Sequence, residues 1–90
     1  MKLKENYILR QLADSWVVIA LSSAVVDLNG MLTLNESGAL LWHALEKGAD
    51  RNKLIDIITG EYVVDRTLAA ADVDEFLEKL IVVGCLDPEE

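Results

Sequence analysis

The stretch MLTLNESGALLW, from Met31 to Trp42, decides the fold because its apolar pattern changes halfway along. The first four residues, MLTL, alternate with the two-residue period of a strand, whereas the last several have the apolar face of a buried helix. Asn35 stands at the position that favours a helix N-cap, and Glu36 falls in the first turn, where the helix dipole favours a carboxylate. The stretch therefore predicts a short strand that ends at Leu34 and turns directly into a helix.

Two apolar runs precede this stretch and have the composition of β-strands. They are YILRQL (Tyr7–Leu12) and SWVVIAL (Ser15–Leu21), and the two residues between them suit a tight antiparallel hairpin. The segment AVVDLNG follows, and Asn29-Gly30 within it is the strongest turn signal in the chain. A turn is therefore expected at Asn29-Gly30, immediately before the strand Met31–Leu34.

Three helices are expected after Leu34, each with an N-cap residue and a terminal glycine. The pairs of cap and glycine are Asn35 with Gly48, Asp50 with Gly60, and Asp65 with Gly84. The third helix carries an apolar stripe formed by Ala69, Val73, Phe76, Leu77 and Leu80. This order predicts one α+β domain over residues 1–90, winged-helix-like, with a small antiparallel sheet of about three strands followed by a three-helix bundle.

The net charge of −8 at pH 7 restricts the partners of the chain. Nucleic acids and anionic membrane surfaces attract lysine and arginine, so an excess of carboxylates argues against both. The apolar run from Trp16 to Leu21 is far shorter than the ~20 residues of a membrane-spanning helix, and its acidic flanks are unlike those of a signal peptide. The single cysteine, Cys85, cannot form a disulfide within the chain. These features predict a cytoplasmic protein.

Residue types that carry catalysis are scarce. The chain has one histidine and one cysteine, and it lacks a glycine-rich phosphate loop and a metal-ligand spacing. We interpret His43 as a helix-surface residue and Cys85 as a small buried apolar residue. Asp72 and Glu75 share a helix face at a spacing that suits a shared proton or cation, but in so acidic a chain they are interpreted as a solvated face. The sequence therefore predicts a protein that is not an enzyme and that holds neither cofactor nor metal.

The uncharged strand Met31–Leu34 points to binding through the backbone. It carries neither charge nor proline, which usually protect the edge of a sheet. Such an edge can accept an extended peptide as an additional strand. Two other occupants remain open, namely the chain's own AVVDL and a second copy of the protein. Gly38, in the first helical turn, also has two interpretations: close packing within the fold or close approach of a ligand.

The motifs LNESGALLW and DVDEFLEKL followed by GCL, with LIDIITGEYVVD between them, resemble the PqqD-like family of recognition elements for ribosomally made, modified peptides. The resemblance extends from about Tyr7 to Leu86. It implies a non-catalytic chaperone that binds the leader of a precursor peptide and presents it to a modifying enzyme, often of the radical SAM type. The founding role of the family is in the synthesis of pyrroloquinoline quinone, which need not be the product here.

The resemblance also implies where the leader binds, namely on the third strand and in a groove against the third helix. By position, the strand residues are Met31, Leu32, Thr33 and Leu34. The helix residues are Val73, Phe76, Leu77, Leu80 and Val83, with Asp72, Glu75 and Lys79 at the rim. Four of these helix residues also belong to the predicted core stripe, so some of them must face the fold instead.

Two further functions remain open. One is a winged-helix DNA-binding regulator, which the acidic residues of the third helix disfavour because they would repel phosphate. The other is a structural subunit that dimerises through the sheet edge. The expected partners are therefore a precursor peptide and its modifying enzyme, and the chain is expected to be a monomer or a weak homodimer.

Overall fold

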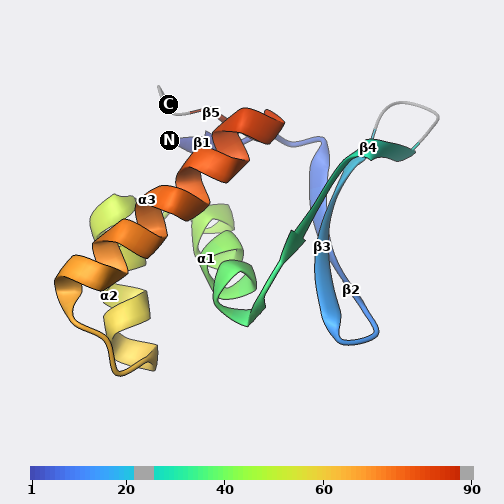
Figure 1. The fold of residues 1–90 in the computed structure, drawn as a ribbon. Helices are drawn as coiled ribbons and strands as arrows, with labels where there is room; N and C mark the ends of the chain where they lie inside the picture. Colours follow the sequence, from blue (N-terminus) through green and yellow to red (C-terminus); the bar gives the residue numbers. More distant parts are fainter. Residues whose placement is uncertain (22–25, 88–90) are drawn as a thin grey trace.

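The computed structural model describes the backbone of residues 1–21 and 26–87, and the side chains of residues 1–20 and 32–87 (Figure 1). The strands are β1 (Lys2–Leu3), β2 (Tyr7–Leu12), β3 (Ser15–Leu21), β4 (Val26–Leu34) and β5 (Leu86–Asp87). The helices are α1 (Glu36–Glu46), α2 (Arg51–Glu61) and α3 (Arg66–Val83). The predicted α+β class, with a small antiparallel sheet followed by three helices, is confirmed.

The main sheet has the order β2-β3-β4, and all of its pairs are antiparallel. The predicted hairpin is confirmed, since Leu12 pairs with Ser15 across a two-residue turn in which Ala13 has a positive φ of 54°. Val18 lies opposite both Leu9 and Leu32, so these three side chains share the face of the sheet that packs against the helices. The helices gather on that side of the hairpin in Figure 1.

The turn predicted at Asn29-Gly30 is wrong, because both residues lie within β4. The pairing of β3 with β4 is irregular at this point: it advances from Val18 to Ala20 on β3 but from Leu32 to Asp27 on β4. The Asn-Gly pair therefore falls where the longer strand accommodates additional residues, as in a bulge, and does not reverse the chain. The strand predicted over Met31–Leu34 is thus the end of a longer strand.

The continuity of β4 also decides whether the chain's own AVVDL could cover the outer edge of Met31–Leu34. Its last three residues, 26–28, extend the same strand as Met31–Leu34, so they do not lie beside it. Ala24 and Val25 lie outside the described residues.

The three predicted N-caps are confirmed, and each side chain accepts a hydrogen bond from a backbone N–H in the first turn. The acceptor and donor pairs are Asn35 and Gly38 (2.8 Å), Asp50 and Lys53 (2.8 Å), and Asp65 and Leu68 (2.7 Å). The predicted glycine stops are confirmed at two helices, where Gly48 and Gly84 have φ values of 93° and 95°.

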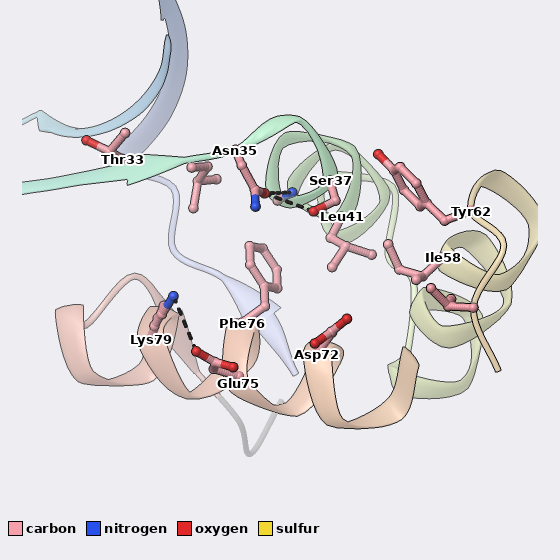
Figure 2. Close-up of a pocket in the computed structure, with 13 residues that line it drawn as sticks. Thr33, Asn35, Ser37, Leu41, Ile58, Tyr62, Asp72, Glu75, Phe76 and Lys79 are labelled. Atoms are coloured by element: carbon pink, nitrogen blue, oxygen red, sulfur yellow. Dashed lines mark hydrogen bonds and ion pairs between the residues drawn. The ribbon is translucent and has the colours of Figure 1, made fainter. Parts of the chain in front are cut away.

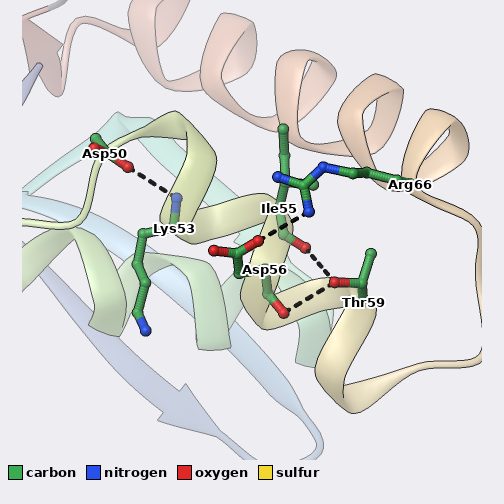
Figure 3. Close-up of polar contacts among 6 residues, drawn as sticks. All are labelled: Asp50, Lys53, Ile55, Asp56, Thr59 and Arg66. Carbon is green, nitrogen blue, oxygen red and sulfur yellow. Dashed lines mark hydrogen bonds and ion pairs between the residues drawn. The ribbon is translucent and has the colours of Figure 1, made fainter.

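The stop predicted at Gly60 is wrong, because α2 continues to Glu61. Tyr62 is the C-cap, and its backbone N–H still donates to the carbonyl of Ile58. Near this end, the Thr59 hydroxyl donates to the backbone carbonyls of Ile55 and Asp56, as Figure 3 shows. A bond from Arg66 to Asp56 (2.9 Å) then connects the start of α3 to α2 (Figure 3).

The core lies between the sheet face and the three helices. The largest of its completely or almost completely buried side chains are Val18, Trp42, Leu54, Val73, Leu80 and Cys85. The predicted α3 stripe is confirmed, since Ala69, Val73, Phe76, Leu77 and Leu80 are all buried. The Trp42 indole N–H has no hydrogen-bond partner among the described residues, so the ring acts in the core as a large apolar group.

A second, two-stranded sheet was not predicted from the sequence. In it β1 pairs with β5, and the Lys4 N–H donates to the Cys85 carbonyl (2.9 Å) beside that pair. Strands β1 and β5, from the first and last described parts of the chain, therefore lie side by side, as Figure 1 shows. Strands of two residues are too short to carry an apolar period, and for this reason the pattern of the sequence could not reveal them.

Close packing within the fold accounts for Gly38. A Cβ at this position would lie 3.1 Å from the Cβ of Leu34 and 3.3 Å from the Asn35 side-chain oxygen. The glycine thus allows the first turn of α1 to approach the end of β4 closely. The angle at which the strand enters the helix depends on this contact and on the Asn35 cap.

We predict that Asn35→Ala lowers the free energy of unfolding by about 1 kcal/mol, because it removes the acceptor of the Gly38 N–H. Urea denaturation measures the change. Ser37→Ala is the matched control: the Ser37 hydroxyl donates to the same Asn35 oxygen (2.9 Å), but it caps no backbone group. A smaller loss is expected for the control. Equal losses would mean that the backbone cap does not stabilise this corner.

We also predict that the Cys85 thiol is unreactive in the folded protein. Burial raises its pKa from 9.0 to about 11, so the thiol stays protonated at pH 8. Iodoacetamide should therefore label native protein far more slowly than protein unfolded in guanidinium, as measured by mass spectrometry. Because the folded pKa is the higher one, the stability from this burial is present below pH 9 and is lost as the pH rises toward 11. Rapid native labelling would contradict this prediction.

Candidate functional site

The outer edge of β4 is the first component of the candidate site. On one side β4 pairs with β3, and no other strand in the described part of the chain pairs with its second side. The edge ends at Leu34, where the Asn35 cap begins α1. Backbone N–H and C=O groups along such an edge are free to pair with an added strand.

A hollow of about 550 Å³ lies beside the end of β4 and is the second component (Figure 2). The corner between β4 and α1 contributes Thr33, Leu34, Asn35, Ser37, Gly38 and Leu41. The end of α2 and the loop after it contribute Ile58, Tyr62 and Val64. The facing wall is α3, which contributes Asp72, Glu75, Phe76 and Lys79. We call this the first hollow.

A second hollow, of about 300 Å³, continues along α3 toward its C-terminal end. It is lined by Leu32, Glu75, Glu78, Lys79, Val82 and Val83. Glu75 and Lys79 line both hollows, so the two follow one another along β4 and α3. Together we call them the α3 groove.

The α3 groove brings together most of the residues predicted for the site. From β4 these are Leu32, Thr33 and Leu34, and from α3 they are Asp72, Glu75, Phe76, Lys79 and Val83. Met31 lies in β4, and its side chain is outside the described residues. The groove therefore combines the end of β4 and one face of α3.

Three predicted groove residues, Val73, Leu77 and Leu80, do not line either hollow. Val73 and Leu80 are 0% exposed and belong to the core. Leu77 is also buried in the core. Among the residues of the predicted α3 stripe, Phe76 alone lines the groove as well as the core.

Several lining residues were missed by the sequence analysis. They are Asn35, Ser37, Gly38, Leu41, Ile58, Tyr62, Val64, Glu78 and Val82. At the β4–α1 corner, Asn35 was recognised only as a cap, and close approach of a ligand was one of the two interpretations of Gly38. The contribution of Ile58, Tyr62 and Val64 depends on how α2 packs against α1 and α3, which no local pattern reports.

The charged groups of the groove differ in whether they have a partner within the chain. Glu75 and Lys79 are 3.7 Å apart on successive turns of α3. Asp72 forms neither a hydrogen bond nor an ion pair with any residue that the structure describes. On another face of α3, Asp74 accepts two hydrogen bonds from Arg51 (2.7 and 2.9 Å), which hold the pKa of that carboxyl below its ordinary value.

Neither His43 nor Cys85 lines the α3 groove. His43 is exposed and bonds to Glu46 (3.0 Å), and its ring meets the edge of Trp16 at a centroid distance of 6.0 Å. The interpretations of His43 as a surface residue and of Cys85 as a buried apolar residue are confirmed. Within residues 1–20 and 32–87, no group of three or more acidic, histidine or cysteine side chains could hold a metal ion.

None of the three helices in the described part of the chain combines the length and the apolar character that crossing a bilayer requires.

Two solved structures resemble the fold over almost its full length. One is described as "TbiB1 in Complex with the TbiA(beta) Leader Peptide"; it is 26% identical, has a TM-score of 0.79, and the match covers 98% of this chain and 96% of that one. The other, "Lasso peptide synthetase B1 complexed with the leader peptide", is 24% identical with a TM-score of 0.77, and covers 97% and 96%. The second likeness concerns the fold alone.

No curated protein matches the chain. The model of one protein family, described as coenzyme PQQ synthesis protein D (PqqD), matches residues 16–86 and so includes β3, β4, all three helices and the α3 groove. This match covers most of the chain and confirms the family resemblance found in its motifs. The chain belongs to the PqqD family.

Proposed function

We propose that this chain is a non-catalytic adaptor that binds the leader of a ribosomally made precursor peptide and presents the peptide to a modifying enzyme. Membership of the PqqD family supports this role. The structural relative at 26% identity supports it further, because that protein is described as a complex with a leader peptide. The proposal places the adaptor in the cytoplasm, where ribosomes make such precursors.

The observation that carries the proposal is the unpaired edge of β4 beside the α3 groove. An extended peptide added to this edge would gain backbone hydrogen bonds, and every second side chain would face α3. The first hollow has room for large side chains, and its depth comes from buried residues such as Phe76 and Leu41. A leader that lacks structure of its own can be held in this way without a catalytic group.

The proposed binding residues divide into two sets. Met31, Leu32, Thr33 and Leu34 supply the backbone edge. Asp72, Glu75, Phe76, Lys79, Val82 and Val83 supply the helix side of the groove. Val73 and Leu80 act from beneath, since their burial holds α3 against the core and thereby fixes the width of the groove.

The class of the modifying enzyme is a separate part of the proposal. The family resemblance predicts a radical SAM enzyme, and this stays a prediction. The adaptor contributes recognition, and the enzyme contributes the chemistry.

The alternative functions are weakened to different degrees. A DNA-binding role conflicts with the net charge of −8 and with the exposed carboxylates Asp72, Glu75 and Glu78 on α3. Dimerisation through β4 uses the same open edge as the proposed leader. Sedimentation at micromolar concentration distinguishes a dimer from a monomeric adaptor.

We predict that a cognate leader peptide shifts the backbone amides of residues 31–34 and of α3 in an NMR titration. The shifts arise because an added strand pairs with the β4 edge and its side chains contact α3. A scrambled peptide of the same composition is the control and should cause far smaller shifts. Shifts confined to the β2 edge or to α2 would contradict the proposed site.

We predict further that Met31→Pro weakens binding of this leader at least about tenfold, because proline removes a backbone donor from the edge. Met31 lies in the irregular segment between the pairs Val18–Leu32 and Ala20–Asp27, so the regular pairing with β3 is expected to survive. Met31→Ala is the matched control, since it keeps the N–H and should bind much more tightly than the proline variant. Calorimetry measures both affinities, and circular dichroism checks that the helices remain. Equal losses of affinity in the two variants would mean that the Met31 side chain, and not its backbone N–H, is responsible.

A further inference from the structure

We propose that the peptide bound in the α3 groove carries a lysine or arginine, whose cationic group pairs with Asp72 while its aliphatic stem lies on the floor of the first hollow. This inference rests on the proposed leader-binding function and adds a requirement for charge at one position. It concerns Asp72 specifically, and not the acidity of the whole chain.

Asp72 is the unneutralised charged group of the first hollow. Figure 2 shows its carboxylate directed from α3 toward the part of the hollow that Tyr62 and Ile58 line. No residue in the described ranges bonds to it, and the one cation of the lining, Lys79, lies one turn beyond Glu75 and 3.7 Å from the Glu75 carboxylate. A bound peptide therefore meets one negative charge that the protein itself leaves uncompensated.

Two acidic side chains outside the hollow, Asp74 and Asp56, form ion pairs with arginine between α2 and α3. Arg51 donates two hydrogen bonds to Asp74, and Arg66 donates one to Asp56. The helical part of the chain has no further arginine, and Arg10 lies in β2. Two residues apart on one helix, Asp74 faces a built-in cation and Asp72 faces the hollow. This difference points to a cation that arrives with the ligand.

The walls of the first hollow suit a long cationic side chain. Leu41, Ile58 and Phe76 provide apolar surface for methylene groups, which lysine and arginine readily bury along their stems. Tyr62, which is 38% exposed, places an aromatic ring beside the same space, where a cation can interact with its face. The arrangement combines a floor for the stem with a carboxylate and an aromatic ring for the charged end.

The binding of a peptide strengthens the requirement for a basic residue near Asp72. A peptide strand over the hollow removes water from Asp72, and an apolar or acidic residue at that point would leave the carboxylate without compensation. A basic residue replaces the lost hydration with a charge-assisted hydrogen bond. Selection for a cation is therefore expected at one position of the peptide, whereas the remaining positions follow the apolar parts of the groove.

The test is selection from a phage-displayed library of random linear peptides, with the full chain as the target. The wild-type protein, Asp72→Asn and Asp74→Asn are panned in parallel, and Met31→Pro identifies peptides that bind elsewhere. Asp74→Asn is the matched control because it makes the same charge change on the same helix, two residues away and facing Arg51. Circular dichroism confirms that each variant is folded.

The expected result is one position enriched in lysine or arginine among peptides selected by wild type and by Asp74→Asn, and no such enrichment with Asp72→Asn. In a selected peptide, replacing that residue by glutamine should weaken binding to wild type about three- to tenfold and leave binding to Asp72→Asn nearly unchanged. Added salt should reduce the loss of affinity for wild type that the glutamine replacement causes.

Two results would overturn the inference. If the peptides depend on the β4 edge but have no enriched basic position, or if Asp72→Asn selects the same basic residue, Asp72 recognises no cation and the adaptor function still stands. If no peptide is enriched relative to Met31→Pro, both the adaptor function and this inference fail.

Discussion

The burial of one face of α3 is the constraint on which the rest of the structure depends. Val73 and Leu80, seven residues apart, are completely buried and belong to the same core cluster as Trp42 and Leu54. With 3.6 residues per turn, fixing this face leaves Asp72, Glu75 and Lys79 on the side that lines the groove. The same helix therefore closes the core and forms the wall of the candidate site, so the stability and the shape of that site have one origin.

The corner at Asn35 determines the position of the end of β4, which forms the wall of the α3 groove opposite α3. The Asn35 side chain caps α1, and Gly38 allows the first helical turn to approach Leu34 within the distance of a tight contact. These two features orient the end of β4 relative to α3 without using any group that an added strand needs. The backbone edge consequently stays available for pairing, while the side chains beneath it are fixed in position. Such an arrangement suits recognition of a peptide and requires no reactive residue.

Much of this arrangement follows from local patterns. The hairpin, the three N-caps, two of the glycine stops and the α3 stripe were predicted from residue spacing, since caps and amphipathic faces are properties of short segments. Two local predictions were wrong for the same reason. Asn29-Gly30 has the preference of a turn and Gly60 that of a helix stop, but β4 and α2 continue through them because the pairing with β3 and the bond from Tyr62 to Ile58 outweigh those weak preferences.

The sequence by itself determined the class of the fold, the boundaries of most elements, the scarcity of catalytic groups and the family motifs. Only the tertiary structure decided which residues of α3 face the core and which face the groove, and it added the end of α2 to the lining of the site. It also showed that Arg51 pairs with Asp74, whereas Asp72 has no partner among the described residues. The physical reason is that a helical period defines faces only relative to one another, whereas the packing of α1, α2 and β4 decides what each face meets.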